Sequence, residues 1–447
     1  MRGARRPLLL AVALPALLAA AQHQVLLRQP PRLERLDLAP ASAGPAALQA
    51  RFSRPIDSAS LASASRLHPP LAHRWLGSGN TLQLSLSAGQ RISQPLQLHL
   101  AGADRRGLRL QPSPWHWDPR GRVLAVVRVR GGEQLQLRQP DGGWRPISPV
   151  WHEIPLVLPL GDGSGVAAAS RLDDGQLRLW LVPIQQHSLV PLQRRPAPTP
   201  SAGRPQRLRP EPVVFAHLSS NRRGDLLVQS GSLEPGSGKA ELRARDGGQR
   251  LLPWRSSGPM QLLPEGGAVL VPDIEGLHLQ ALPPAPARRQ TLPGSRDLSS
   301  FCPQAGRAVL VRHWPDFRRS LELVEPGQPP RQLWLGRDAV LASACSRGGE
   351  RVWALLLEGY RQPRLRLVVL GRQGQLLGQR QLQGWELEPG TGLHWDPASG
   401  RLLAALRRLR SGSQRPDPAR AVLIDGISLE LLPLPPAIRQ ALWLPAG

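Results

Sequence analysis

The strongest constraint on the fold is a pattern that recurs between residues 115 and 406. The segment WHWDPRGRVLAVV at 115–127 returns as LHWDPASGRLLAAL at 393–406. Each copy has a short apolar segment, a turn that ends in glycine, and a strongly apolar segment. The glycine that precedes the second segment marks seven copies: Gly121, Gly165, Gly224, Gly267, Gly306, Gly349 and Gly400. Successive marker glycines are 44, 59, 43, 39, 43 and 51 residues apart, and the longest interval contains a Pro-rich insert at 196–210.

A repeat of about 40 to 50 residues with four short strands is typical of a β-propeller blade. Apolar segments at 176–182, 364–370 and 421–425 supply third strands after three of the copies. We therefore predict an all-β protein with a propeller over residues 112–447. Seven copies predict seven blades, with six as the alternative. Each copy is expected to form the innermost hairpin of one blade.

The turn within each copy explains why these residues recur. In Asp118-Pro119-Arg120-Gly121, Asp at the first position, Pro at the second and Gly at the fourth favour a type I turn. The segments Trp117–Gly121 and Trp395–Pro397 resemble the TolB-type, WD40-like propeller repeat, whereas the middle copies depart from it. Members of that family usually have six blades. The resemblance implies a fold more than a function.

Residues 25–110 differ from the repeats. Alternating apolar segments at 48–52, 81–86 and 96–100 are separated by Gly, Pro, Asn and Asp, which predicts a small β-sandwich. The segments Phe52–Asp57, Asn80–Leu82 and Gly102–Gly107 resemble the bacterial Ig-like domains of exported proteins. That resemblance implies a spacer or contact module without catalysis.

The N-terminus has the composition of an export signal. Three arginines precede an apolar run of about a dozen residues, and Ala19-Ala20-Ala21 provides small residues for cleavage. We predict a signal peptide at 1–21, with an uncleaved membrane anchor as the alternative. The protein is therefore expected in the periplasm or cell envelope.

The charge of the chain is strongly positive. The formal net charge is +25, and Lys239 is the only lysine among 57 basic residues. This excess could attract anionic lipid or polysaccharide. It could also reflect a general use of Arg as the solvated cation, because the arginines form no dense run. Predicted export argues against nucleic acid as a partner.

Two His-x-Asp pairs are the weak candidates for a metal site. If the first and last copies occupied neighbouring blades, their imidazole and carboxylate groups could hold a divalent cation: His116, Asp118, His394 and Asp396. Turn formation already explains both Asp residues, and the other copies lack the His. We therefore predict neither a metal nor a cofactor.

Cys302 and Cys345 are the only cysteines, and they occupy equivalent positions in adjacent copies. In an oxidising compartment such a pair favours a disulfide. The alternative is two small buried residues whose thiols never meet.

We find no catalytic motif in the chain, so the predicted function is binding. Propeller loops would recognise a protein of the envelope, with Arg318, Arg319 and Arg361 as candidate contacts. The variable loops lie at 196–210, 314–319, 359–363 and 411–419. One alternative is a carbohydrate- or metal-dependent lectin or hydrolase that uses the central funnel. Another is electrostatic binding to anionic lipid or polysaccharide.

Overall fold

A computed structural model shows a chain of two compact units. It describes residues 28–41, 44–192, 199–234, 237–286, 288–359, 363–409 and 417–446, together with 22 and 24. The first unit comprises residues 1–90, 94–118 and 189–197, and the second comprises 91–93, 119–188 and 198–447. The predicted export signal at 1–21 lies outside the described residues. Among the described residues, no helix has the length and apolar character that crossing a membrane requires.

The first unit contains two four-stranded antiparallel sheets, with strand orders β1-β2-β5-β4 and β14-β7-β6-β3. Buried and exposed residues alternate in β2, where Leu48, Ala50 and Phe52 are buried and the residues between them are exposed, as in a strand with one face on a core. The predicted segments at 48–52, 81–86 and 96–100 are confirmed as β2, β5 and β6. The strands are β1 (Leu33–Ala39), β2 (Ala47–Phe52), β3 (Arg66–His68), β4 (His73–Leu76), β5 (Thr81–Leu86), β6 (Leu96–Leu100), β7 (Ser113–Trp117) and β14 (Leu189–Pro191).

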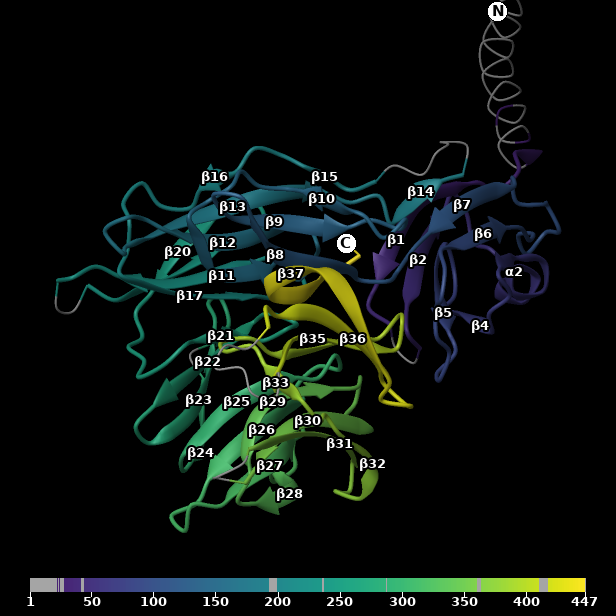
Figure 1. The fold of residues 1–447 in the computed structure, drawn as a ribbon. Coiled ribbons are helices and arrows are strands. Elements are labelled where there is room, and N and C mark those ends of the chain that lie inside the picture. The colour runs from purple at the N-terminus through teal and green to yellow at the C-terminus, as the bar shows by residue number, and fades with distance from the viewer. Residues whose placement is uncertain are drawn as a thin grey trace, which may run out of the picture. The chain divides into compact units, whose positions relative to one another are not determined.

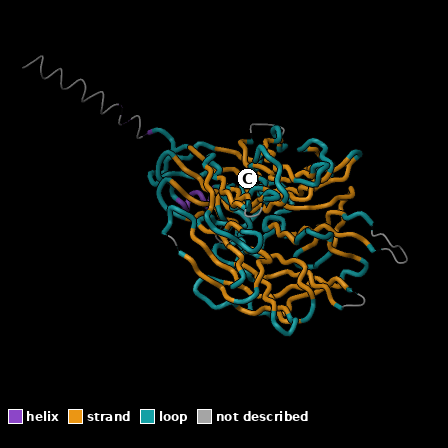
Figure 2. The backbone as a smooth tube through the Cα atoms, turned by 90° about the vertical axis from the view of Figure 1, so that its left-hand side faces the viewer, coloured by secondary structure: helices purple, strands orange, loops and turns teal. Residues whose placement is uncertain are grey.

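A short helix, α2 (Ser58–Ala64), joins β2 to β3. It begins after Asp57, whose carboxylate accepts hydrogen bonds from the backbone N–H groups of Ala59 and Ser60. It is drawn in purple in Figure 2, where strands and loops make up most of the trace.

The first copy of the repeat does not form the predicted hairpin. Its opening segment is β7, which pairs with β6 and β14 in the first unit. Its second segment is β8 (Arg122–Val129), which pairs with β9 and β37 in the second unit. The prediction for this copy was wrong because another strand, from the C-terminal part of the chain, occupies the edge of β8.

The second unit is a β-propeller of antiparallel sheets. Five of its sheets have the orders β11-β12-β13-β15, β17-β18-β19-β20, β21-β22-β23-β24, β25-β26-β27-β28 and β29-β30-β31-β32 within the described residues. In the first of them β16 also pairs with β13, and β14, which lies between β13 and β15 in the chain, belongs to the first unit. In each of the five sheets, the first two strands are the predicted hairpin of one copy. The bounds are β11 (Glu153–Pro159), β12 (Gly165–Arg171), β13 (Leu177–Gln185), β15 (Ser201–Ala202), β16 (Gln206–Arg207), β17 (Phe215–Ser220), β18 (Leu226–Gly231), β19 (Lys239–Arg243), β20 (Gln249–Leu252), β21 (Gln261–Leu262), β22 (Ala268–Asp273), β23 (Gly276–Ala281), β24 (Arg289–Pro293), β25 (Arg296–Phe301), β26 (Ala308–His313), β27 (Arg319–Val324), β28 (Arg331–Gly336), β29 (Ala339–Cys345), β30 (Arg351–Glu358), β31 (Arg364–Gly371) and β32 (Leu376–Gln381).

A larger sheet contains both the first and the last strands of the second unit. Its order is β10-β9-β8-β37-β36-β35-β33, and β34 also pairs with β35. The long strand β37 pairs with β36 through its first half and with β8 through its second half. In Figure 1 the yellow β37 lies between β8 and β36. The remaining bounds are β9 (Gly132–Arg138), β10 (Trp144–Pro146), β33 (Trp385–Leu387), β34 (Leu393–Asp396), β35 (Arg401–Arg408), β36 (Arg420–Asp425) and β37 (Leu431–Leu444).

The core of the propeller lies between neighbouring sheets. One cluster joins Trp353 and Leu355 of β30 to Leu402 and Ala404 of β35, and all four are buried. Because the middle strands are covered on both faces, they read as nearly continuous apolar runs.

Candidate functional site

One cavity of the second unit is lined largely by the first strands of its sheets. Its volume is about 710 Å³, and its wall comes from β11, β21, β25, β29 and β34 together with β26, β27 and β37. Small and apolar side chains form most of the wall. Ser300 and Ser343, on neighbouring strands, share a hydrogen bond of 2.8 Å between their hydroxyl groups.

Aromatic side chains line one sector of this cavity, which we call the channel. Trp395 stacks on Trp353 with ring centroids 4.3 Å apart, and the indole N–H of Trp443 donates to the backbone oxygen of His394 at 3.1 Å. These contacts hold both lining indoles, Trp395 and Trp443, in the wall. Burial lowers the pKa of His394 to about 4, so its imidazole is neutral at physiological pH.

Charged groups are concentrated where the channel meets β25, β26 and β27. The imidazole of His313 lies 2.8 Å from the carboxylate of Asp297, whose side chain is 75% exposed. Arg319 is paired with His313 in the strand register and also lines the channel. Asp297 is the one carboxylate among the described lining residues, so the paired acids of a typical glycosidase do not occur in this wall.

The two His-x-Asp pairs do not lie in equivalent places. His116 belongs to β7 and, with Asp118, to the first unit, whereas His394 and Asp396 belong to the second. The metal hypothesis assumed equivalent positions in neighbouring blades, and that assumption was wrong because β7 pairs outside the propeller. Within the described ranges, no three His, Cys, Asp or Glu side chains are grouped to hold a metal ion.

Asp396 has the structural role that turn chemistry predicts. Its carboxylate accepts hydrogen bonds from the backbone N–H groups of Ser399 at 3.0 Å and Ala398 at 3.4 Å. The residue is 5% exposed, and burial raises the pKa of its carboxyl despite these bonds.

Cys302 and Cys345 form a disulfide. Their Cα atoms are 4.8 Å apart, within the range that a bridge requires. Cys302 follows β25 and Cys345 ends β29, so the bridge joins the innermost strands of two neighbouring sheets. Both residues are buried in one apolar cluster with Val309 and Val352.

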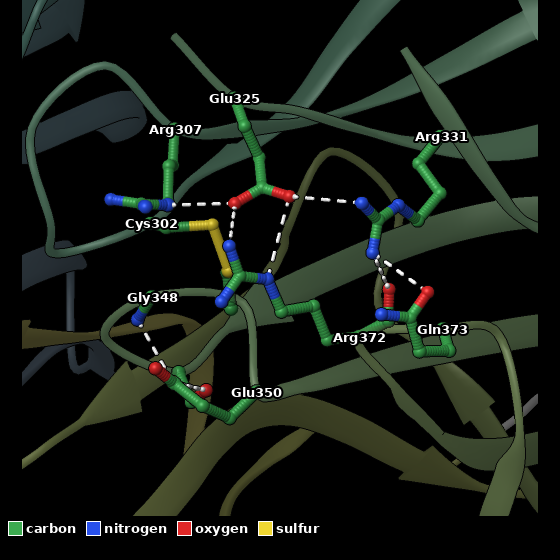
Figure 3. Close-up of polar contacts among 10 residues, drawn as sticks. Cys302, Arg307, Glu325, Arg331, Gly348, Glu350, Arg372 and Gln373 are labelled. Carbon is green, nitrogen blue, oxygen red and sulfur yellow. Dashed lines mark hydrogen bonds and ion pairs between the residues drawn. A yellow bond between two sulfur atoms is a disulfide. The ribbon is translucent and has the colours of Figure 1, made fainter. Parts of the chain in front are cut away.

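A buried carboxylate surrounded by guanidinium groups lies beside this disulfide (Figure 3). Glu325, with a side chain 5% exposed, lies 3.1 Å from Arg307, 3.9 Å from Arg331, and within hydrogen-bond reach of Arg372. Burial alone would raise the pKa of Glu325, but the guanidinium groups of Arg372 and Arg307 lower it. Nearby, Glu350 accepts hydrogen bonds from Ser346 and from the backbone N–H of Gly348.

This cluster links the turns of two neighbouring sheets. Arg307 precedes β26, Glu325 follows β27, and Arg372 lies in the turn between β31 and β32. Because each charge has a partner, the cluster positions the turns and presents no poised acid or base. Sequence reasoning missed Glu325, since nothing local distinguishes it from the other turn carboxylates.

The candidate contact arginines differ in their surroundings. Arg318 lies on the turn between β26 and β27 and pairs with Asp316 at 2.6 Å, with a side chain 45% exposed. Arg319, next to it, is partly buried in the channel wall. Arg361 lies outside the described residues, as do parts of the loops at 196–210, 359–363 and 411–419.

Acid is expected to weaken the second unit through Asp425. Its carboxylate accepts from Arg91 at 2.5 Å and from the backbone N–H groups of Ile427 and Ser428 at 2.9 and 2.8 Å. Although burial opposes the shift, these partners lower the pKa of Asp425 from 3.8 to about 2. A lowered folded-state pKa means that the stabilisation is complete above about pH 4 and is lost as pH falls toward 2.

The measurement is the free energy of unfolding in urea between about pH 5 and pH 2 for the wild type and Asp425→Asn. We expect the wild type to lose about 1–2 kcal/mol more than the variant, after allowance for solvent screening of this partly exposed pair. Equal losses in the two proteins would contradict the assigned role of Asp425.

Comparisons with known proteins find only distant similarity, to solved structures. No family model matches the chain, and no curated protein matches it in sequence. TolB from Acinetobacter baumannii is 12% identical, with a TM-score of 0.39 over 64% of this chain and 76% of TolB. The β-propeller domain of the Trilobed protease from Pyrococcus furiosus is 10% identical, with a TM-score of 0.45 over 78% of this chain and 96% of that domain. The uncharacterized protein lmo1340 from Listeria monocytogenes is 12% identical, with a TM-score of 0.47 over 71% of this chain and 92% of that protein.

The propeller fold is assigned from the strand pairing of this chain. Structural similarities of this degree say nothing about its function. The second unit is a propeller in which the turn at 314–319 carries exposed charged and apolar side chains, whereas the wall of the channel is largely neutral.

Proposed function

We propose that this protein is an exported, non-enzymatic binding protein of the cell envelope, which recognises a protein partner through turns of its propeller. The observation that carries the proposal is a contrast within the second unit. The channel wall is mostly small and apolar, whereas the turn at 314–319 carries exposed charged and apolar side chains. A rigid sheet scaffold with variable turns is suited to recognition.

Export is supported by the disulfide between the only two cysteines, because such bonds persist in oxidising compartments. On this proposal residues 1–21 are the export signal, or an anchor that remains uncleaved. The first unit is an Ig-like contact module. We interpret the sheets of the second unit as seven blades, with β37 shared between the first and the last.

Affinity capture from the native envelope fraction tests the proposal. The tagged protein is crosslinked mildly, and captured material is identified by mass spectrometry at low and high salt. A defined protein that survives high salt is the expected result. Enrichment of lipid or polysaccharide alone, removed by high salt, would replace the proposal with electrostatic binding of an anionic surface.

A variant of the turn at 314–319 tests whether its arginines contact the partner. Replacement of Arg318 and Arg319 by Ala is expected to weaken capture of the protein partner about tenfold, because charged contacts at an interface guide association. The melting temperature should stay close to that of the wild type, since the side chain of Arg318 is 45% exposed and Arg319 is only partly buried. Unchanged capture would exclude these two side chains as contacts.

A further inference from the structure

The turn between β26 and β27 has the backbone of a glycine turn but contains no glycine. The N–H of Trp314 donates to the oxygen of Arg318 at 3.0 Å, and the N–H of Phe317 donates to the oxygen of Trp314 at 3.1 Å. The N–H of Arg318 donates to the carboxylate of Asp316. The same three hydrogen bonds close three other turns of the second unit: Gln139–Gly143, Leu172–Gln176 and Ala244–Gly248.

Phe317 occupies the position that glycine has in those turns. Gly142, Gly175 and Gly247 have φ angles of 89°, 83° and 93°, and Phe317 has a φ angle of 63°. This left-handed region is open to glycine and strained for a bulky side chain. The Phe317 side chain does not recover that strain by packing, because the residue is 87% exposed. The fold itself therefore gives no reason for an aromatic residue here, and an observed strain of this kind indicates a function.

A second apolar tip lies on the neighbouring sheet. Ile274 is 92% exposed in the turn between β22 and β23, which Asp273 and Gly276 close as a strand pair. Turns of this length favour Gly, Asn and Asp, and a β-branched residue is an unusual occupant.

The two tips are held against one connecting segment. Gly294 donates its N–H to the oxygen of Glu275 at 3.2 Å, and the next residue, Ser295, accepts from the N–H of His313 at 2.9 Å. Both turns are thus fixed to the short link between β24 and β25. Figure 1 shows β23 and β25 as neighbours in the green part of the ribbon. We call Ile274, Phe317 and the charged groups around them the two-tip surface.

The charges of the two-tip surface differ from those of the chain as a whole. Its carboxylates are Asp273, Glu275, Asp297, Asp316 and Glu322, and its guanidinium groups are Arg289, Arg296, Arg312, Arg318 and Arg319. These charges balance, in a chain whose formal net charge is +25. Both direct neighbours of Ile274, Asp273 and Glu275, are acidic, which disfavours an anionic lipid or polysaccharide at that tip and favours a partner that brings cations.

We propose that the two-tip surface binds a polypeptide segment that presents apolar side chains next to Lys or Arg. Phe317 and Ile274 are its apolar anchors, and Glu275 and Asp297 are the groups that meet the cations. This inference rests on the proposed function, because it names the chemistry of the partner that the turns recognise. Anchors of this kind commonly dominate the affinity of an interface.

The probe is a display library of random linear peptides, selected on the full-length protein. Enriched peptides are then synthesised, and their dissociation constants are measured by fluorescence anisotropy. We expect enriched sequences to combine apolar residues with Lys or Arg. Phe317→Gly should weaken their binding by about tenfold or more. Its melting temperature should equal or exceed that of the wild type, because glycine relieves the left-handed strain.

Two further variants make the test specific. Ile274→Ser should also weaken binding. Leu376→Ser should leave it unchanged, because Leu376 is also exposed (55%) but lies on the edge strand β32 of a different sheet. Peptides that bind the wild type and Phe317→Gly equally would overturn the inference and leave the proposed function standing. If the library yields no enriched peptide while envelope capture yields a protein, the inference is likewise overturned and the proposed function stands.

Lipid vesicles test whether the two tips bind a membrane instead of a polypeptide. Vesicles of phosphatidylglycerol and phosphatidylethanolamine should not bind the two-tip surface. Binding of these vesicles to the wild type that is lost in Phe317→Gly would overturn the assignment of a polypeptide.

Discussion

Deletion of residues 438–447 is expected to abolish the cooperative unfolding transition of the second unit. The second half of β37 pairs with β8 over Ile438 to Leu444, and Ile438, Ala441 and Leu444 are at most 1% exposed. Each buried Ile or Leu contributes about 1.5–3 kcal/mol. Loss of the strand also leaves the edge of β8 unpaired. The sum approaches the whole stability of a typical domain, about 5–15 kcal/mol.

Differential scanning calorimetry of the truncated and full-length proteins measures this effect. Leu432→Ser is the matched control, because Leu432 lies on the same strand and is 53% exposed. The control should melt within about 2 °C of the wild type, as most surface substitutions do. A truncated protein that melts cooperatively near the wild-type temperature would show that β37 does not close the propeller.

Removal of the disulfide is expected to lower the free energy of unfolding by about 4 kcal/mol. The bridge joins residues 43 positions apart, and a closed loop of that length restricts the unfolded chain by about this amount. Cys302→Ser/Cys345→Ser also places two hydroxyl groups in an apolar cluster, so the double variant should lose at least as much.

Urea unfolding with and without dithiothreitol provides the measurement, and the double variant provides the control. Reductant should shift the midpoint of the wild type and leave that of the variant unchanged. Mass analysis after alkylation under native, non-reducing conditions should find no modified thiol. Two alkylated cysteines in the native protein would remove the bridge from the description of this fold.

Much of the strand pattern could be predicted from local sequence. The predicted third strands at 364–370 and 421–425 correspond to β31 (Arg364–Gly371) and β36 (Arg420–Asp425). Those predictions hold because turn residues and apolar runs act over a few positions. The all-β propeller class is likewise confirmed by the sheets of the second unit. It could be predicted because the repeat sets the spacing of strands along the chain.

The candidate site was less accessible from the sequence. Asp297 and Glu325 are single acidic residues without a motif, and their surroundings come from strands and turns distant in the chain. The strain at Phe317 is visible only when its φ angle is compared with those of Gly142, Gly175 and Gly247. A signal did exist, since Pro315-Asp316-Phe317 differs from Pro140-Asp141-Gly142 only at its last residue.

The sequence by itself determined the class of fold, the positions of most strands and the glycine turns between them, since these depend on neighbours along the chain. Only the tertiary structure decided that Trp115–Trp117 pairs with β6 and that β37 pairs with β8. It also decided that Phe317 and Ile274 are held against one link. The physical reason is that pairing between distant segments depends on which strand edges and faces remain open once the other sheets have formed, and no local pattern contains that information.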